Sequence, residues 1–366
     1  MQDLKALIAD GDVWQALAQE TRPLVIYGMG NGADKLIERL ARIGKAPAAI
    51  FASDDFVRGQ TFHGFRICRF SDIQEQFSSF VVLVSFGSRI PDVMNVLFDM
   101  ADRYPLLLPD MPVAGEQDFT AAFLKANIDK LQAVYDLLED ELSKRIYLSV
   151  LRYKLTGDIR FLKEACSSEA EDFACLPCGQ IRIAIDGGAY NGDTAKQMIR
   201  HFPNLKKIYA VEPDEKNHKK LCKFAADQIN IVTEPHLAAL WSECGVGSFS
   251  TSGNRNSSLV SSSYEHKMTN VPLLTVDSLE NGEPIDFIKY DVEGAEREAL
   301  QGSIHTIQKW RPSLAVSLYH RSDDLFDLPL FIREIYPNYR FFLRRVSCLP
   351  AWEITLYATR KEESDG

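Results

Sequence analysis

The chain has 366 residues, a length that favours two domains over one. Hydrophobic residues make up 46% of it and charged residues 25%, which is typical of a folded globular protein and excludes extensive disorder. The formal net charge of −10 argues against a nucleic-acid-binding protein, because neutralising phosphates requires clustered Lys and Arg.

The first twenty residues have an acidic amphipathic pattern, without the basic start and apolar core of a secretion signal. No apolar run is long enough to span a bilayer. The seven cysteines are scattered and odd in number, which is typical of reduced thiols. We therefore expect a cytoplasmic protein without a membrane span. The single CxxC motif, Cys175–Cys178, has no second pair and does not predict a metal site.

Residues 1–116 are predicted to form an N-terminal Rossmann-like domain. An apolar strand, Leu24–Tyr27, leads into a turn containing Gly28, Gly30 and Gly32. A helix (Ala33–Ile43), a strand (Ala48–Phe51), a buried strand (Phe80–Gly87) and a helix over 91–104 follow. Strands that alternate with helices predict a parallel, doubly wound sheet.

The glycine turn of this domain has no acid before it, which suits an anion, and Asp54 and Asp55 follow the next strand. This half resembles the small Rossmann-like domains attached to sugar-modifying enzymes, including those that hold nucleotide sugars. Two interpretations stay open: the turn binds such a ligand, or it has a structural or dimerising role. The sequence also leaves open whether the chain forms a homo-oligomer.

Residues 117–180 are predicted to form a helical connector, interrupted at Gly157, and residues 181–366 a second α/β domain. Its expected strands cover 181–186, 207–213, 286–294 and 313–320, with helices between them and a closing hairpin over 339–346 and 352–360. A polar loop rich in Ser, Gly and Asn is predicted over 251–263. The fold class is therefore α/β, with two doubly wound Rossmann-like domains joined by helices.

The segment AIDGGAYNGDTA, Ala184–Ala195, places three glycines after a strand, but without the G-x-G-x-x-G spacing of a dinucleotide site. Asp186 and Asp193 bracket these glycines and would repel a pyrophosphate, whereas they would attract a cation. S-adenosylmethionine carries a sulfonium and an ammonium and has no phosphate. Glu212 ends the next strand, where a carboxylate accepts hydrogen bonds from ribose hydroxyls. Asp193 is equally suited to capping the following helix.

The strand that ends in KYDVEGAE adds Asp291 and Glu293 to the same predicted crevice, since ligands bind at the carboxyl ends of strands in open α/β sheets. Glu296 and Glu298 follow on a helix and are interpreted as solvated surface residues. His320 ends the next strand.

The motifs IDGGAYNGDT, AVEPD, IDFIKYDVEGAEREALQG and SLAVSLYH resemble the FkbM family of S-adenosylmethionine-dependent methyltransferases. The resemblance implies a class I fold, a seven-stranded sheet whose last strand is antiparallel, and methyl transfer to a hydroxyl of a sugar, glycan or related natural product. It implies these cofactor-binding residues: Asp186, Gly187, Gly188, Ala189, Tyr190, Asn191, Gly192, Asp193, Thr194, Glu212, Pro213 and Asp291. For adenine, the segment PHLAALWS offers only His236, a backbone amide or Trp241.

Methyl transfer to a hydroxyl requires a base, and His320 is the first choice, also as a substrate-binding residue, because its ordinary pKa is near neutrality. The alternative interpretation is a hydrogen-bonded histidine of the core or one that supports the site from behind. Asp291 and Glu293 are the alternatives, either as base or as ligands of a divalent metal ion, which the spacing does not favour. Ser257 and Ser258 are predicted to bind a polyol acceptor, or to lie in a loop that orders over it. The competing function is a non-catalytic nucleotide- or nucleotide-sugar-binding scaffold with a degenerate methyltransferase domain.

Overall fold

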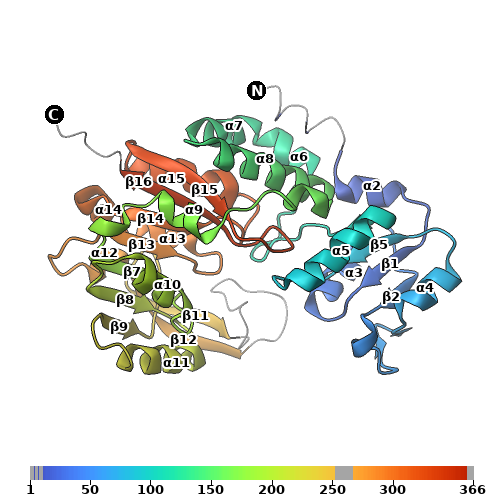
Figure 1. Cartoon of the computed structure of the whole chain (residues 1–366), viewed down its shortest axis with the longest axis horizontal. Coiled ribbons are helices and arrows are strands. Elements are labelled where there is room, and N and C mark those ends of the chain that lie inside the picture. The colour runs from blue at the N-terminus through green and yellow to red at the C-terminus, as the bar shows by residue number, and fades with distance from the viewer. Residues whose placement is uncertain (1–3, 5–6, 8–10, 252–266, 361–366) are drawn as a thin grey trace.

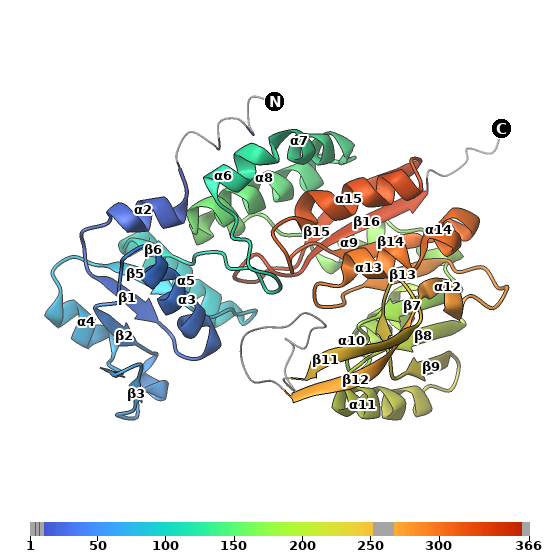
Figure 2. The same ribbon diagram turned by 180° about the vertical axis from the view of Figure 1, so that it is seen from behind.

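The computed structural model describes residues 4, 7, 11–251 and 267–360. A four-stranded sheet and a seven-stranded sheet lie at opposite ends of the molecule, and helices α6, α7 and α8 run along one side between them (Figures 1 and 2). Strands and helices alternate in both units. The predicted α/β fold class is confirmed.

The N-terminal sheet is parallel and has the strand order β2-β1-β5-β6. Its strands are β1 (Leu24–Tyr27), β2 (Ala49–Phe51), β5 (Val81–Val84) and β6 (Leu106–Leu107). Its helices are α2 (Val13–Gln19), α3 (Asn31–Arg42), α4 (Phe70–Gln76) and α5 (Pro91–Arg103). A small hairpin, β3 (Thr61–Phe62) with β4 (Phe65–Arg66), the helix α4 and the edge strand β6 were not predicted.

Close packing explains the glycines of the first turn. A Cβ on Gly32 would lie 1.9 Å from the carbonyl oxygen of Ser85, and one on Gly28 would lie 2.7 Å from the Phe86 ring. Gly30 caps α3 with a φ of +95°, a conformation that glycine adopts without strain. The turn therefore needs glycine to bring α3 against β5, whether or not it binds a ligand.

The segment between the sheets is helical: α6 (Ala121–Ala126), α7 (Ile128–Leu137), α8 (Glu141–Thr156), the 3₁₀ turn Ile159–Leu162 and α9 (Glu169–Ala174). The Asp140 carboxylate accepts a hydrogen bond from the backbone N–H of Ser143 and starts α8. Gly157 ends α8 with a φ of +69°, at the predicted interruption.

The C-terminal sheet has the order β15-β16-β14-β13-β7-β8-β9. Its strands are β7 (Ile183–Gly187), β8 (Lys207–Val211), β9 (Val232–His236), β13 (Phe287–Tyr290), β14 (Ser313–Ser317), β15 (Tyr339–Arg345) and β16 (Ile354–Arg360). Only β16 runs against its neighbours, which matches the predicted seven-stranded sheet with an antiparallel last strand. Because β15 runs parallel to β14, the loop after β15 opens at the same edge as the ends of β7, β8, β13 and β14.

Helices cover both faces of this sheet: α10 (Asp193–His201), α11 (Glu215–Ala226), α12 (Val276–Leu279), α13 (Glu296–Gln301), α14 (Ile304–Trp310) and α15 (Asp324–Ile335). Alternate residues of each strand belong to different cores, as the pleat requires. Ile185 and Leu314 belong to the core that contains α8 and α15, whereas Ala184 and Ala315 pack with α10.

A third sheet was missed. The strands β10 (Ala239–Leu240), β11 (Gly245–Thr251) and β12 (Lys267–Leu274) form it in the order β10-β12-β11. Most of the predicted polar loop, including Ser257 and Ser258, lies outside the described residues. Within the described part of the chain, no helix has both the length and the apolar character that crossing a membrane requires.

Candidate active site

A cavity of about 870 Å³ opens at the carboxyl edge of the large sheet. The ends of four parallel strands contribute to its wall: Gly188 and Tyr190 follow β7, Glu212 follows β8, Asp291 and Glu293 follow β13, and Ser317 ends β14. Parallel strands thus bring side chains together that are more than a hundred residues apart in sequence. Such a crevice is the expected ligand site of an open α/β sheet.

The glycine turn after β7 borders this cavity. Its backbone packs closely against the residues that follow β13. Gly188 has a φ of +77°, and a Cβ there would lie 1.9 Å from the carbonyl oxygen of Asp291. Tyr190 also has a positive φ, +48°, and its backbone N–H donates to Glu212 at 2.9 Å. The turn is therefore fixed both against β13 and against the end of β8.

Glu212 is 6% exposed and lines the cavity. Burial raises the pKa of its carboxyl to about 7, although the backbone N–H groups of Asp214 and Tyr190 hydrogen-bond it and act in the opposite direction. Each of its two oxygens accepts one of these bonds. The Asn217 side chain also hydrogen-bonds this carboxyl, so about one of the four acceptor positions of a carboxylate remains for a hydroxyl donor of a ligand.

Asp186 is fully buried, and neither of its oxygens has a hydrogen-bond partner. Burial raises the pKa of this carboxyl. The Lys289 ammonium lies between two acids, 3.5 Å from Asp186 Oδ1 and 3.4 Å from Asp291 Oδ2. Burial disfavours the charged lysine, but Asp291 and Asp186 outweigh that effect and raise the pKa of Lys289. Asp186 thus lies behind Lys289 and does not line the cavity itself.

Asp291 is held from the other side by Ser317 and Tyr319, whose hydroxyls donate to Oδ1 at 2.9 and 3.1 Å. Burial acts to raise its pKa, but the nearby Lys289 and His320 charges dominate and lower the pKa to about 2. Asp291 is therefore a fixed anion at neutral pH. Such a group orients neighbours well but accepts protons poorly.

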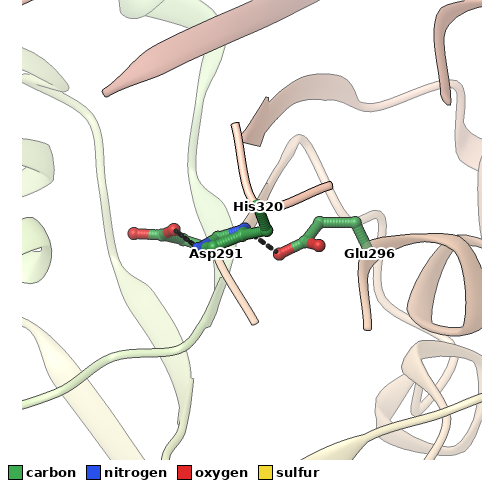
Figure 3. A group of neighbouring side chains, drawn as sticks. All are labelled: Asp291, Glu296 and His320. Carbon is green, nitrogen blue, oxygen red and sulfur yellow. Dashed lines mark ion pairs between the residues drawn. The ribbon is translucent and has the colours of Figure 1, made fainter. Parts of the chain in front are cut away.

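His320 is fully buried, and its ring lies between Asp291 and Glu296 (Figure 3). Its Nδ1 lies 3.0 Å from Glu296 Oε1, and its Nε2 lies 3.7 Å from Asp291 Oδ1 and 3.5 Å from Glu293 Oε2. Burial alone would lower the pKa of His320, but Glu296 and the other carboxylates raise it to about 10. The imidazole is a cation at neutral pH, which argues against His320 as the proton acceptor.

The interpretation of Glu296 as a solvated surface residue is wrong. Glu296 is 1% exposed, and its carboxylate accepts the backbone N–H groups of Val292, at 2.8 Å, and Gly294, at 3.1 Å. It starts α13 and fixes the turn that carries Glu293, whose φ is +56°. Nothing in the periodicity of the helix revealed this role, since a first-turn glutamate is usually exposed. Glu298 is half-buried.

Glu293 lines the cavity beside this turn. Burial raises the pKa of its carboxyl to about 8. A group with a pKa near the working pH is suited to accept a proton. Of the three catalytic candidates from the sequence, Glu293 has the pKa closest to neutrality.

Asp291, Glu296 and His320 also form the one group of metal-ligand types found among the described residues. The histidine ring lies between the two carboxylates and directs one nitrogen to each (Figure 3). One donor atom from each of the three residues lies within 4.8 Å of the others, but the ring pairs a different nitrogen with each carboxylate, which fits an ion-paired chain. The thiols of Cys175 and Cys178 donate to backbone carbonyls of Asp172 and Phe173.

The other sequence-predicted residues divide into two groups. Asp193, Thr194 and Pro213 line the cavity, whereas Gly187, Ala189, Asn191 and Gly192 build the turn behind it. After β9, the cavity wall consists of Ala238, Ala239 and Leu240 and does not include Trp241 or His236. The geometry therefore does not favour the His236 and Trp241 side chains as adenine contacts, and the backbone amide remains the candidate from the sequence.

Comparison with known proteins agrees with this architecture. Residues 186–343 match a family model described as Methyltransferase FkbM domain. The crystal structure of Methyltransferase FkbM from Methylobacillus flagellatus KT is similar over 98% of this chain and 97% of its own, with a TM-score of 0.72 and 20% identity. No curated protein matches the chain.

Two further solved structures are similar to about half of the chain. An rRNA methylase from Streptococcus thermophilus has 14% identity and a TM-score of 0.34, covering 53% of this chain and 95% of its own. Fibrillarin from Aeropyrum pernix, solved with S-adenosyl-L-methionine, has 16% identity and a TM-score of 0.32, covering 50% and 69%. The expected family resemblance is confirmed: residues 186–343 match the FkbM methyltransferase domain.

Proposed function

We propose that the protein is an S-adenosylmethionine-dependent O-methyltransferase that acts on a hydroxyl of a sugar, glycan or related natural product. The FkbM domain supports methyl transfer. The observation that carries the donor assignment is the concentration of buried and half-buried carboxylates around a glycine turn that leaves no room for a side chain at Gly188.

The residues present fit S-adenosylmethionine. Glu212 retains an acceptor position for a ribose hydroxyl, and Asp193 lies at the wall where a positive ammonium would be attracted. Both oxygens of Asp186 lack hydrogen bonds, and Lys289 is the only group that pairs with them among the described residues. The bound donor would supply the electrophilic methyl group. Movement of Lys289 away from Asp186 and toward Asp291 would expose the Asp186 carboxylate to the ammonium.

The chain itself supplies orientation and proton transfer. We propose that Glu293 accepts the proton of the acceptor hydroxyl as the oxygen attacks in line, since its pKa lies close to neutrality. The cationic His320, 3.5 Å from Glu293 Oε2, would favour the ionised state of this base before transfer. Asp291, fixed by Ser317 and Tyr319, would hold the acceptor or the donor in place.

Calorimetric titration of S-adenosylmethionine into the full chain tests the donor assignment. We expect micromolar binding by the wild type and binding weaker by about tenfold or more in Glu212→Gln, because a hydrogen bond to a charged group contributes ~1.5–3 kcal/mol. Asp186→Asn should weaken binding as well. The control is Glu38→Gln on the exposed face of α3, which should bind as the wild type does. A folded wild type that does not bind the donor would refute the proposal.

A further inference from the structure

The cavity extends beyond the methyltransferase sheet to the N-terminal unit. Two loops form this extension: residues 87–90, which follow β5, and residues 346–353, which connect β15 to β16. Figures 1 and 2 show the β15–β16 loop reaching from the large sheet toward α5. At about 870 Å³, the whole cavity lies in the upper part of the ~300–1,000 Å³ range of small-molecule sites. It has room for a second ligand beside a donor.

Three direct contacts connect the loops. Ser88 and Leu349 exchange backbone hydrogen bonds of 2.7 and 2.9 Å. Arg89 forms an ion pair with Glu353. The Trp352 ring packs on Gly87, where a Cβ would lie 2.5 Å from a ring carbon. The two loops are therefore built as one wall with fixed geometry.

This wall is unusually apolar for a surface that water reaches. Trp352 is 38% exposed, Val346 43% and Ile90 61%, and all three line the cavity. Exposed apolar side chains gathered around a hollow mark a binding site more often than scattered ones do. Beside them, the Arg89–Glu353 pair offers N–H donors and carboxylate acceptors in one place.

Backbone strain points to the same cavity. Five residues other than glycine have a positive φ in the described part of the chain, and three of them, Tyr190, Glu293 and Glu353, line this cavity. Left-handed backbone costs ~1–2 kcal/mol for such residues, and residues with strained backbone cluster at active sites and ligand-binding segments. Tyr190 and Glu293 belong to the proposed donor and base region. Glu353, in the β15–β16 loop, has the same left-handed backbone.

We propose that residues 87–90 and 346–353 form the acceptor subsite, and that its ligand is a sugar ring. The apolar C–H face of the ring would lie on Trp352, and its hydroxyls would bond to the Arg89–Glu353 pair. An aromatic ring with a polar pair at its edge matches a ligand that has one apolar face and a polar rim. This inference rests on the proposed function, and it assigns the N-terminal unit a direct part in acceptor binding.

The test measures donor and acceptor binding separately. Full-length protein saturated with S-adenosylhomocysteine is titrated calorimetrically with methyl α-glucopyranoside, methyl α-mannopyranoside, methyl β-galactopyranoside and methyl α-rhamnopyranoside. We expect at least one glycoside to bind the wild type, and Trp352→Ala and Arg89→Ala to weaken that binding at least tenfold. Neither variant should change S-adenosylhomocysteine affinity more than twofold.

Matched controls are Phe56→Ala, which removes another exposed aromatic ring (62% exposed), and Arg42→Ala, which breaks an exposed ion pair on α3. Both should bind glycosides as the wild type does. Equal glycoside binding by wild type and Trp352→Ala would overturn the subsite, and so would no glycoside binding by protein that binds S-adenosylhomocysteine. Failure to bind S-adenosylhomocysteine would instead overturn the donor assignment on which the subsite rests.

Discussion

At the scale of single residues, the site depends on buried charged groups that lie close together and stabilise one another's ionised forms. Glu296 is the clearest case, because one buried carboxylate pairs with His320 and also accepts the backbone N–H groups of the turn that carries Glu293. The raised pKa of His320, about 10, depends on Glu296 more than on any other carboxylate. Asp324, buried on α15, lies near Glu296 and His320, and burial raises the pKa of its carboxyl to about 8.

We predict that Glu296→Gln destabilises the protein most near pH 6 and least near pH 10. A histidine with a raised folded-state pKa stabilises fully below its unfolded pKa of ~6.5, and that contribution is lost as the pH rises through about 10. Glu293 and Asp324 ionise near pH 8 and then repel Glu296. This repulsion also makes the loss of the Glu296 charge less destabilising at high pH. Removing one partner of a buried pair costs ~3–5 kcal/mol, the loss expected at pH 6.

Urea unfolding of wild type and variant at pH 6 and pH 9.5 measures this difference. The control Glu38→Gln breaks an exposed pair and should change the free energy of unfolding by less than ~1 kcal/mol at both values. A Glu296→Gln loss that is the same at both pH values would show that His320 is not held as a cation.

At the scale of elements, the glycine turn after β7 depends on a backbone contact that no larger residue permits. We predict that Gly188→Ala lowers the free energy of unfolding by ~2–4 kcal/mol. The left-handed backbone contributes ~1–2 kcal/mol of this, and the overlap with the Asp291 carbonyl contributes the rest. Urea unfolding measures the loss. Gly179→Ala is the matched control: a Cβ there meets nothing within 4 Å, so its effect should stay within ~1 kcal/mol.

The elements that sequence analysis predicted are those with a strong local signal. β7, β8, β13 and β14 are apolar runs followed by a helix; β8, β13 and β14 lie within their predicted segments, and β7 ends one residue beyond its own. β11 and β12 were not predicted. The residues of β11, Gly245–Thr251, are mostly small and polar, and the strand forms through its pairing with β12, which is a tertiary contact. In the site, strand ends identified Glu212, Asp291 and Glu293. Glu296 and the loop 346–353 gave no such signal, because their roles depend on which distant groups surround them.

At the scale of the whole molecule, the two sheets share one core. A single cluster of buried residues includes Val25 and Val82 of the N-terminal sheet and Leu314 and Leu356 of the large sheet, with α8 between them. Polar contacts cross the same region. The backbone N–H of Ala114 donates to the carbonyl oxygen of His320 at 2.8 Å, so the segment after β6 reaches the candidate active site. The acceptor subsite therefore depends on two units that are packed together, and we expect them to unfold together.

Lys154 of α8 and Asp110 after β6 test this cooperativity. Their side chains are 2% and 5% exposed, and Lys154 Nζ lies 2.8 Å from Asp110 Oδ2. We predict that Lys154→Met leaves Asp110 buried without a counter-charge and lowers the free energy of unfolding by ~3–5 kcal/mol, whereas Lys154→Met with Asp110→Leu recovers most of it. Scanning calorimetry should show one transition for wild type and both variants, shifted to lower temperature in the single variant. Two separate transitions in the single variant would mean that the sheets unfold independently, because the shared core would then not couple them.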